Sequence, residues 1–164
     1  MATVKFKGTP METVGELPKV GEQVPAWVLT RADLTDMALA DLGKKHKLLN
    51  IFPSLDTGVC AASVREFNRR AGQVSTAIVL HISRDLPFAQ KRFCQAEAIN
   101  NSETVSAFRS SFPRDYGLEI ATGPMKGLCA RSVLVLDGEN QVVYAQLVEE
   151  ITHEPDYQSA MHYL

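Results

Sequence analysis

The sequence of 164 residues has no long apolar run, no excess of one charge and few cysteines. No apolar run exceeds four positions, whereas a membrane-spanning helix needs about 20, so we expect no membrane segment. Residues 1–7 lack the apolar stretch of a secretory signal, and we expect none. The 17 basic and 19 acidic residues give a net charge of −2, which provides no electrostatic attraction to nucleic acid or to an anionic membrane.

The three cysteines, Cys60, Cys94 and Cys129, are far apart and form no C-x-x-C pair. This spacing excludes zinc ribbons and the C-x-x-C class of oxidoreductases. The four histidines are scattered without the spacing of a metal site, so we expect neither a metal nor a cofactor. A small, odd number of cysteines is more typical of a cytoplasmic protein than of a secreted disulfide scaffold.

Apolar patterning predicts an α/β protein, and the length predicts one domain over residues 1–164. Residues 48–52 form a near-continuous apolar run, which is typical of a strand buried on both faces. Residues 57–71 follow a helical repeat, and residues 76–82 form a second apolar run. The short connections between these three segments predict a right-handed parallel βαβ unit.

The remaining elements predict a thioredoxin-like fold, a central mixed β-sheet flanked by helices, with an N-terminal β-hairpin extension. These elements are a hairpin at 4–10, a helix at about 86–94, a hairpin of 132–136 with 141–147, and a C-terminal helix from 152 to 163. Residues 95–130 contain several glycines, which indicate long loops. Pro155 is expected near the first turn of the C-terminal helix.

The segment from Pro53 to Cys60 carries the strongest chemical signal. It lies between a predicted central strand and the next helix, where open α/β sheets collect their ligands. Cys60 falls in the first helical turn, whose unpaired N–H groups and positive dipole end favour a thiolate. The alternative is that Cys60 is one more small buried residue beside Val59 and Ala62, and its location alone leaves both interpretations open.

Longer motifs resemble a known family. The pattern Pro-x-x-x-Thr-x-x-Cys, formed by Pro53, Thr57 and Cys60, resembles the active-site motif of peroxiredoxins. The wider segments that resemble the thiol peroxidase branch of that family are residues 50–65, 83–94, 123–128 and 147–157. The similarity therefore spans nearly the whole chain and includes a second cysteine, Cys94, in the next helix.

The resemblance implies a role for each of five residues. Cys60 would be the peroxidatic cysteine and Cys94 the resolving cysteine, joined in an intramolecular disulfide. Thr57 would hold the peroxide and the sulfur through its hydroxyl, and Pro53 would shield the site from water. Arg131 matches the family arginine that pairs with the thiolate, and a guanidinium near sulfur favours the ionised form.

The same resemblance implies a cytoplasmic homodimer that reduces hydrogen peroxide and organic hydroperoxides and is itself re-reduced by thioredoxin. Two alternatives remain: a one-cysteine peroxidase in which an external thiol resolves Cys60, and a redox-sensing module without useful turnover. Cys129 and His81 are interpreted as structural core residues. Arg84 and Asp85 are expected to cap and solvate the helix that follows them.

Overall fold

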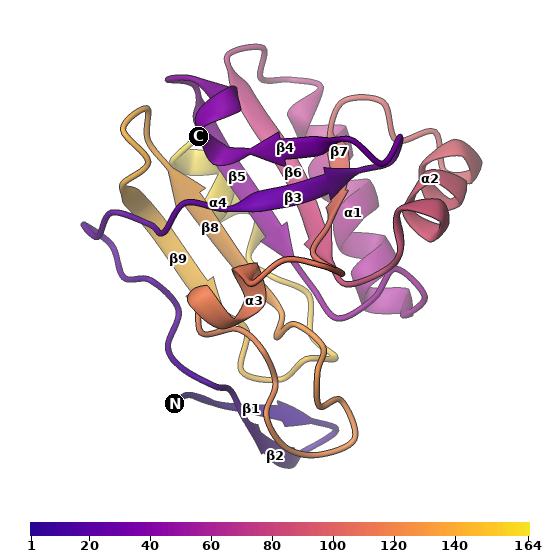
Figure 1. Ribbon diagram of the computed structural model, residues 1–164, viewed down its shortest axis with the longest axis vertical. Coiled ribbons are helices and arrows are strands. Elements are labelled where there is room, and N and C mark those ends of the chain that lie inside the picture. Colours follow the sequence, from indigo (N-terminus) through magenta and orange to yellow (C-terminus); the bar gives the residue numbers. More distant parts are fainter.

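The computed structural model describes residues 1–164 and places a seven-stranded mixed sheet at the centre (Figure 1). The sheet order is β4-β3-β7-β6-β5-β8-β9. Its strands are β3 (Val28–Arg31), β4 (Asp36–Ala38), β5 (His46–Ile51), β6 (Ala77–Ser83), β7 (Glu103–Ser106), β8 (Ser132–Leu136) and β9 (Val142–Leu147). The helices are α1 (Gly58–Ala71), α2 (Pro87–Ala96), α3 (Phe112–Asp115) and α4 (Tyr157–His162), with a 3-10 turn, η1, at Leu39–Leu42. None of the helices is long and apolar enough to cross a membrane.

The predicted βαβ unit is confirmed, and it consists of β5, α1 and β6. Strand β5 is a central strand of the sheet. It pairs in parallel with β6 and antiparallel with β8, so that Leu49 lies between Leu80 and Leu134. All β5 residues after the first are buried, which explains why the segment is apolar without alternation. The mixed sheet with its flanking helices is the expected thioredoxin-like arrangement.

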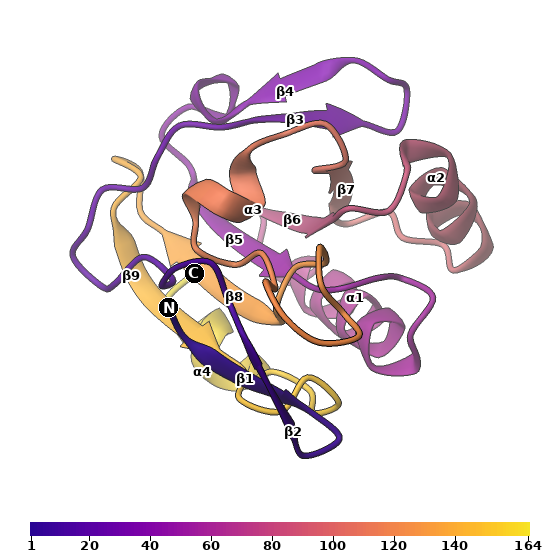
Figure 2. The same ribbon diagram turned by 60° about the horizontal axis from the view of Figure 1, so that its bottom comes forward.

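The two faces of the sheet bury different clusters, and the helices lie on opposite sides (Figure 2). On one face, Leu49 and Leu80 pack with Phe112 of α3 and with Trp27. On the other face, Leu48 packs with residues of α1 and α4. Covering both faces removes the apolar surface of the central strands from water, which is the main stabilising contribution to such a sheet.

Helix α1 begins and ends close to the predicted limits. Thr57 is its N-cap and Gly72 its C-cap. The buried face includes Cys60, Val64 and Phe67, spaced at i, i+4 and i+7 as an amphipathic helix requires. The cap and the apolar stripe together fix where the first turn starts, and therefore where Cys60 lies.

The N-terminal hairpin is also as expected and forms a separate two-stranded sheet of β1 (Thr3–Phe6) and β2 (Thr9–Glu12). Its two-residue turn has positive φ at Lys7 (50°) and Gly8 (82°). Two consecutive positive φ values match the tight turn that suits the twist of a hairpin.

Two sequence-based expectations were wrong. Residues 95–130 are not only loops: β7 pairs in parallel with β6 and antiparallel with β3, and so joins the β3–β4 hairpin to the sheet. The C-terminal helix begins at Tyr157 rather than at 152, because the Asp156 side chain accepts a hydrogen bond from the Ser159 N–H and caps it there. Pro155 therefore precedes the cap instead of lying in the first turn.

Candidate active site

The loop between β5 and α1 carries two of the predicted site residues, Pro53 and Thr57, of which Thr57 contacts Cys60. Pro53 is buried two residues after the end of β5. The Thr57 hydroxyl accepts a hydrogen bond from the Cys60 N–H at 3.2 Å and donates one to the Ser54 carbonyl at 3.3 Å. Cys60 itself is fully buried with Phe52, Leu55 and Val64. The threonine therefore caps α1 and fixes the backbone of the cysteine at the same time.

Arg131 reaches the same sulfur from the start of the neighbouring strand, β8. It directly precedes β8, whose first residue, Ser132, pairs with Ile51 at the end of β5. One guanidinium nitrogen, Nη2, donates to Cys60 Sγ at 3.2 Å, and Nε donates to the Ile151 carbonyl at 2.9 Å. A separation of 71 positions in sequence is thus closed by one antiparallel strand pair.

The Arg131 guanidinium is buried without a carboxylate partner. The side chain is 1% exposed, and its third nitrogen, Nη1, has no hydrogen-bond partner. Every ion pair of the molecule involves other residues. An unpaired buried charge is costly, so an anion beside the guanidinium stabilises the arrangement. The sulfur of Cys60 is the side-chain atom that this guanidinium contacts.

Cys94 lies on α2 and is not in contact with Cys60. Its Sγ is 3.4 Å from the Thr104 hydroxyl on β7, and all three cysteines are free. Burial raises the pKa of the Cys94 thiol, a shift that the Thr104 contact partly opposes. Phe93 and Ile99, on either side of it in sequence, pack against the cluster that holds Cys60. The structure is therefore that of the dithiol form, with α2 folded.

Comparison with known protein families shows that the family model described as Redoxin matches residues 19–161. The chain belongs to the redoxin family. Thiol peroxidases of Mycobacterium bovis and Mycobacterium tuberculosis are each 52% identical to it over 161 residues, which cover 98% of this chain and 97% of theirs. This likeness places the chain in the thiol peroxidase branch, as the motifs indicated.

Solved structures agree with the redoxin fold. A peroxiredoxin-like protein from Aquifex aeolicus superposes with a TM-score of 0.94 at 38% identity, covering 99% of this chain and 95% of that one. A thiol peroxidase from Chromobacterium violaceum gives a TM-score of 0.89 at 21% identity, covering 96% of this chain and 91% of that one. At that lower identity the likeness shows the fold alone.

The sequence analysis missed the role of Asp85 in this redoxin, which is to hydrogen-bond the loop before α1. Leu86, not Asp85, is the N-cap residue of α2, and it makes no side-chain cap, so the expected capping role was wrong. The Asp85 carboxylate instead accepts hydrogen bonds from the Ser54 hydroxyl, the Leu55 N–H and the Ser83 hydroxyl. The available signal was its position at the carboxyl end of β6, beside the carboxyl end of β5 in the parallel pair.

The neighbouring Arg84 does not solvate the helix either. Its guanidinium donates to the Glu119 carboxylate at 2.7 Å and to the Gly127 carbonyl. These bonds hold the segment between α3 and β8 against the end of β6. Arg84 therefore connects two segments of this redoxin by hydrogen bonds and does not cap a helix.

Cys129 and His81 lie in the core of the redoxin, as interpreted from the sequence. Burial raises the pKa of the Cys129 thiol to about 12, which keeps it protonated and unreactive. His81 is fully buried, and its two ring nitrogens contact the Asn50 amide at 3.1 Å and the Ser102 hydroxyl at 2.8 Å. Burial lowers the pKa of His81 to about 3, so the ring is neutral.

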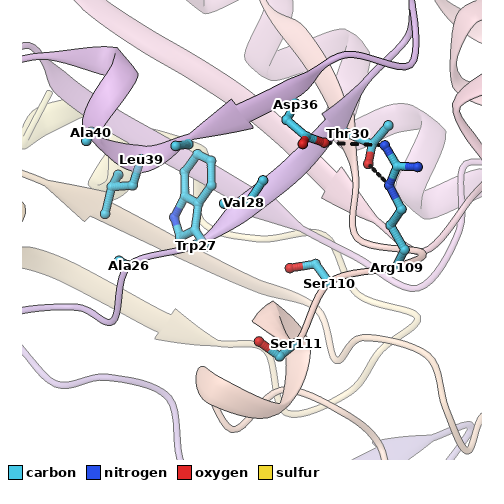
Figure 3. Close-up of a pocket in the computed structure, with 11 residues that line it drawn as sticks. Ala26, Trp27, Val28, Thr30, Asp36, Leu39, Ala40, Arg109, Ser110 and Ser111 are labelled. Atoms are coloured by element: carbon cyan, nitrogen blue, oxygen red, sulfur yellow. Dashed lines mark hydrogen bonds and ion pairs between the residues drawn. The ribbon is translucent and has the colours of Figure 1, made fainter.

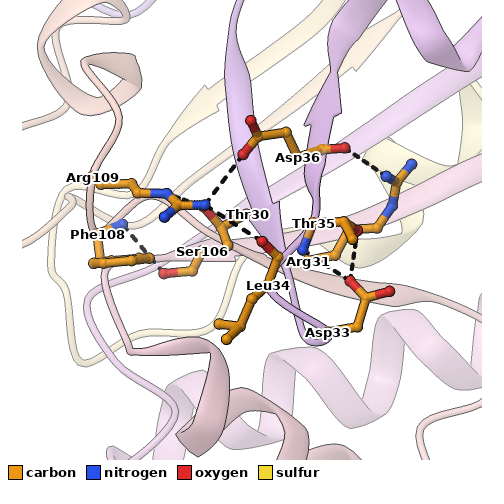
Figure 4. Close-up of polar contacts among 9 residues, drawn as sticks. All are labelled: Thr30, Arg31, Asp33, Leu34, Thr35, Asp36, Ser106, Phe108 and Arg109. Atoms are coloured by element: carbon orange, nitrogen blue, oxygen red, sulfur yellow. Dashed lines mark hydrogen bonds and ion pairs between the residues drawn. The ribbon is translucent and has the colours of Figure 1, made fainter.

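A groove of about 560 Å³ lies away from Cys60, along the β3–β4 hairpin (Figure 3). Trp27 and Leu39 form part of its apolar wall, and Arg109 is its one cationic side chain. That guanidinium is already bound by Thr30 at 3.1 Å and Asp36 at 3.3 Å, within a set of polar contacts at the hairpin (Figure 4). The groove contains none of the predicted site residues and offers no free charge to a ligand.

Proposed function

We propose that this redoxin is a thiol-dependent peroxidase with Cys60 as its peroxidatic cysteine. The observation that carries the proposal is the buried Arg131 guanidinium, which donates to Cys60 Sγ at 3.2 Å and has no carboxylate partner. Thiolate, not thiol, is the nucleophile, and a neighbouring cation favours it. The thiol peroxidases that are 52% identical to this chain support the same assignment.

The first step is attack of the Cys60 thiolate on one oxygen of hydrogen peroxide or an organic hydroperoxide. An S–O bond forms while the O–O bond breaks, and the leaving hydroxide or alkoxide takes up a proton and departs as water or alcohol. Cys60 is oxidised by two electrons to the sulfenic acid. Arg131 and the Thr57 hydroxyl are the donors proposed to stabilise the charge that develops on the peroxide oxygens. Buried Pro53 closes one side of the site to water.

The second step is condensation of the sulfenic acid with the Cys94 thiol, in which an S–S bond forms and water leaves. A disulfide needs Cα atoms within about 7 Å, and packing of Phe93 and Ile99 on the Cys60 cluster opposes that approach. We propose that α2 unwinds locally before the bond forms. Unwinding also exposes Cys94 and so removes the burial that raises the pKa of its thiol.

Re-reduction by thioredoxin completes the proposed cycle. The thioredoxin dithiol supplies two electrons and two protons to the Cys60–Cys94 bond and is itself oxidised to a disulfide. We also propose that the protein works in the cytoplasm as a homodimer, with one domain in each chain. Leu86, Phe88 and Phe108 are 51%, 67% and 39% exposed, and they provide apolar surface for such a contact.

The test is oxidation of the dithiol protein with an equimolar amount of hydrogen peroxide, followed by non-reducing peptide mapping. We expect one dominant bond, Cys60–Cys94 within a single chain. A dominant Cys60–Cys129 or intermolecular bond would remove Cys94 from the mechanism. The Cys94→Ser variant should stop at the Cys60 sulfenic acid.

Steady-state peroxide consumption separates the alternatives. Turnover with thioredoxin, thioredoxin reductase and NADPH that is lost in Cys94→Ser supports the two-cysteine peroxidase. Undiminished turnover of Cys94→Ser with an external thiol supports the one-cysteine alternative. A Cys60–Cys94 bond that forms once without turnover supports the redox sensor.

A further inference from the structure

The loop that carries the proposed catalytic groups has little backbone support of its own. After Ile51 the chain leaves the sheet apart from one bond, from the Phe52 N–H to the Ile82 carbonyl at 3.1 Å. Pro53 has no N–H to donate. Within the following turn, the Thr57 N–H bonds to the Ser54 carbonyl at 3.2 Å. Something outside the loop must therefore fix its distance from the rest of the site.

The Asp85 carboxylate supplies that outside connection. Oδ1 accepts from the Ser54 hydroxyl at 2.7 Å, and Oδ2 accepts from the Leu55 N–H at 2.8 Å. Oδ2 also accepts from the Ser83 hydroxyl at 2.7 Å, so one bond anchors the carboxylate to β6 while two hold the loop. No cation competes for this carboxylate, because every ion pair of the molecule involves other residues.

The connection continues from Asp85 to Cys60 in two ways. The Ser54 residue that Asp85 holds accepts, on its backbone carbonyl, a hydrogen bond from the Thr57 hydroxyl. That hydroxyl in turn accepts a hydrogen bond from the Cys60 N–H. Leu55, whose N–H is held by Asp85, is 5% exposed and packs in the same cluster as Cys60. The Asp85 carboxylate, which does not contact the sulfur, is thereby connected both to Thr57, through hydrogen bonds, and to the apolar cluster around Cys60, through Leu55.

We propose that Asp85 is a positioning residue for peroxide reduction, holding the loop so that Thr57 and Pro53 stand where the peroxide must bind. The proposal rests on the proposed function of Cys60. The peroxide reaction depends on the placement of these groups, and a shift of about 1 Å can cost on the order of 100-fold in rate. Simple alkylation of the thiolate needs no such placement, so the two reactions separate positioning from general reactivity.

The experiment compares two electrophiles on Cys60 in a Cys94→Ser background, which stops the reaction after its first step. Rate constants for hydrogen peroxide and for iodoacetamide are measured against pH by mass spectrometry of the Cys60 peptide. For Asp85→Ala we expect the peroxide rate constant to fall about tenfold or more while the alkylation rate constant changes less than about threefold. Asp85→Asn should recover part of the loss, because an amide oxygen still accepts from the Leu55 N–H and the Ser54 hydroxyl can accept from the amide nitrogen.

The matched control is Asp56→Ala, which removes a carboxylate from the same loop. Asp56 is exposed, and its carboxylate makes no hydrogen bond to the loop. Only its backbone N–H does so, by donating to the Ser54 hydroxyl at 3.1 Å. We expect both of its rate constants to equal those of the parent. If Asp85→Ala does not fold, Ser54→Ala removes one of the two bonds between Asp85 and the loop and leaves the Leu55 N–H bond in place. A smaller but still selective loss of the peroxide rate constant is then expected.

The outcomes are distinct from failure of the proposed function. A parent whose Cys60 reacts with peroxide no faster than a free thiol would refute the peroxidase proposal, whatever Asp85 does. A parent that is fast with peroxide, together with an equally fast Asp85→Ala variant, would overturn the positioning role alone. Where only Ser54→Ala folds, an equally fast Ser54→Ala variant would overturn the part of the role that runs through the Ser54 hydroxyl. A parallel fall in both rate constants would also overturn it and would leave Asp85 as a stabiliser of the fold only.

Discussion

Substitution of Arg131 by methionine tests whether the buried guanidinium acts in the reaction or only favours the thiolate. Methionine fills a similar volume, but it removes the positive charge and the donor 3.2 Å from Cys60 Sγ. Loss of one fixed donor to developing negative charge typically costs about 10²–10³ in rate, or ~3–4 kcal/mol in the barrier. That effect must persist at a pH high enough to ionise the reacting thiol fully. A loss of thiolate alone would instead be repaired by raising the pH.

We expect Arg131→Met to be slow at neutral pH and to stay at least about tenfold slow at high pH. The assay is the rate of peroxide oxidation of Cys60 across the pH range, in the variant and the parent. Arg131→Lys is a useful companion because lysine keeps the charge but lacks the fork that serves Sγ and the Ile151 carbonyl together. Its rate should lie between those of the parent and the methionine variant.

Stability must be measured beside the rate, because the substitution leaves the Ile151 carbonyl without its 2.9 Å bond. An unpaired buried acceptor costs about 1–3 kcal/mol, whereas removing an unpaired buried charge offsets part of that cost. We therefore expect a folded variant with a modest change in urea midpoint. Full recovery of the rate at high pH would leave Arg131 as a promoter of the thiolate only, and no effect at any pH would place it outside the site.

Three further predictions concern His81, Cys129 and Phe93, which are fully or partly buried. His81 has a pKa of about 3 when folded against about 6.5 unfolded, so the unfolded state binds more protons in between. Stability should fall as the pH drops through that window, by up to ~1.4 kcal/mol per unit, and urea titrations should find a shallower fall in His81→Gln. Cys129→Ala should keep near-parental turnover with a modest loss of stability, and a tenfold loss of activity without unfolding would contradict its structural role. Phe93→Ala removes packing against the Cys60 cluster and should speed disulfide formation after oxidation, measured by quenched-flow trapping; unchanged kinetics would argue against opening of α2.

The parts of the fold that the sequence predicted are those in which burial dictates composition. β5 and β6 are buried on both faces and read as apolar runs, and α1 shows its apolar stripe. β7 was missed because Glu103–Ser106 contains a single apolar residue, Val105. Its neighbours Thr104 and Ser106 are buried with hydrogen bonds to the Cys94 thiol and the Asp85 carbonyl, which only the tertiary structure supplies.

The site shows the same division between local and tertiary information. The position of Cys60 in the first turn of a helix followed from local patterning, but its pairing with Arg131 came from resemblance to a family. No local signal joins those residues, because the contact depends on β8 pairing beside β5. Asp85 was misassigned for a related reason: its sequence context is that of a helix cap, while its partners lie on the neighbouring loop. Capping is a local rule, and here a tertiary hydrogen bond prevails over it.

The contacts that bury Cys60 would also oppose the proposed disulfide with Cys94, and the two helices that carry these cysteines differ in how firmly they are held. Helix α1 buries seven of its 14 residues, including Cys60, and is capped by Thr57. Helix α2 buries only Pro87 and Gln90 among its ten residues and has no side-chain cap. Few buried contacts and an uncapped end are the properties of a segment that opens at low free-energy cost. Cys94 lies in the last turns of α2, beyond both buried residues, so the proposed movement of its thiol would leave Pro87 and Gln90 in place.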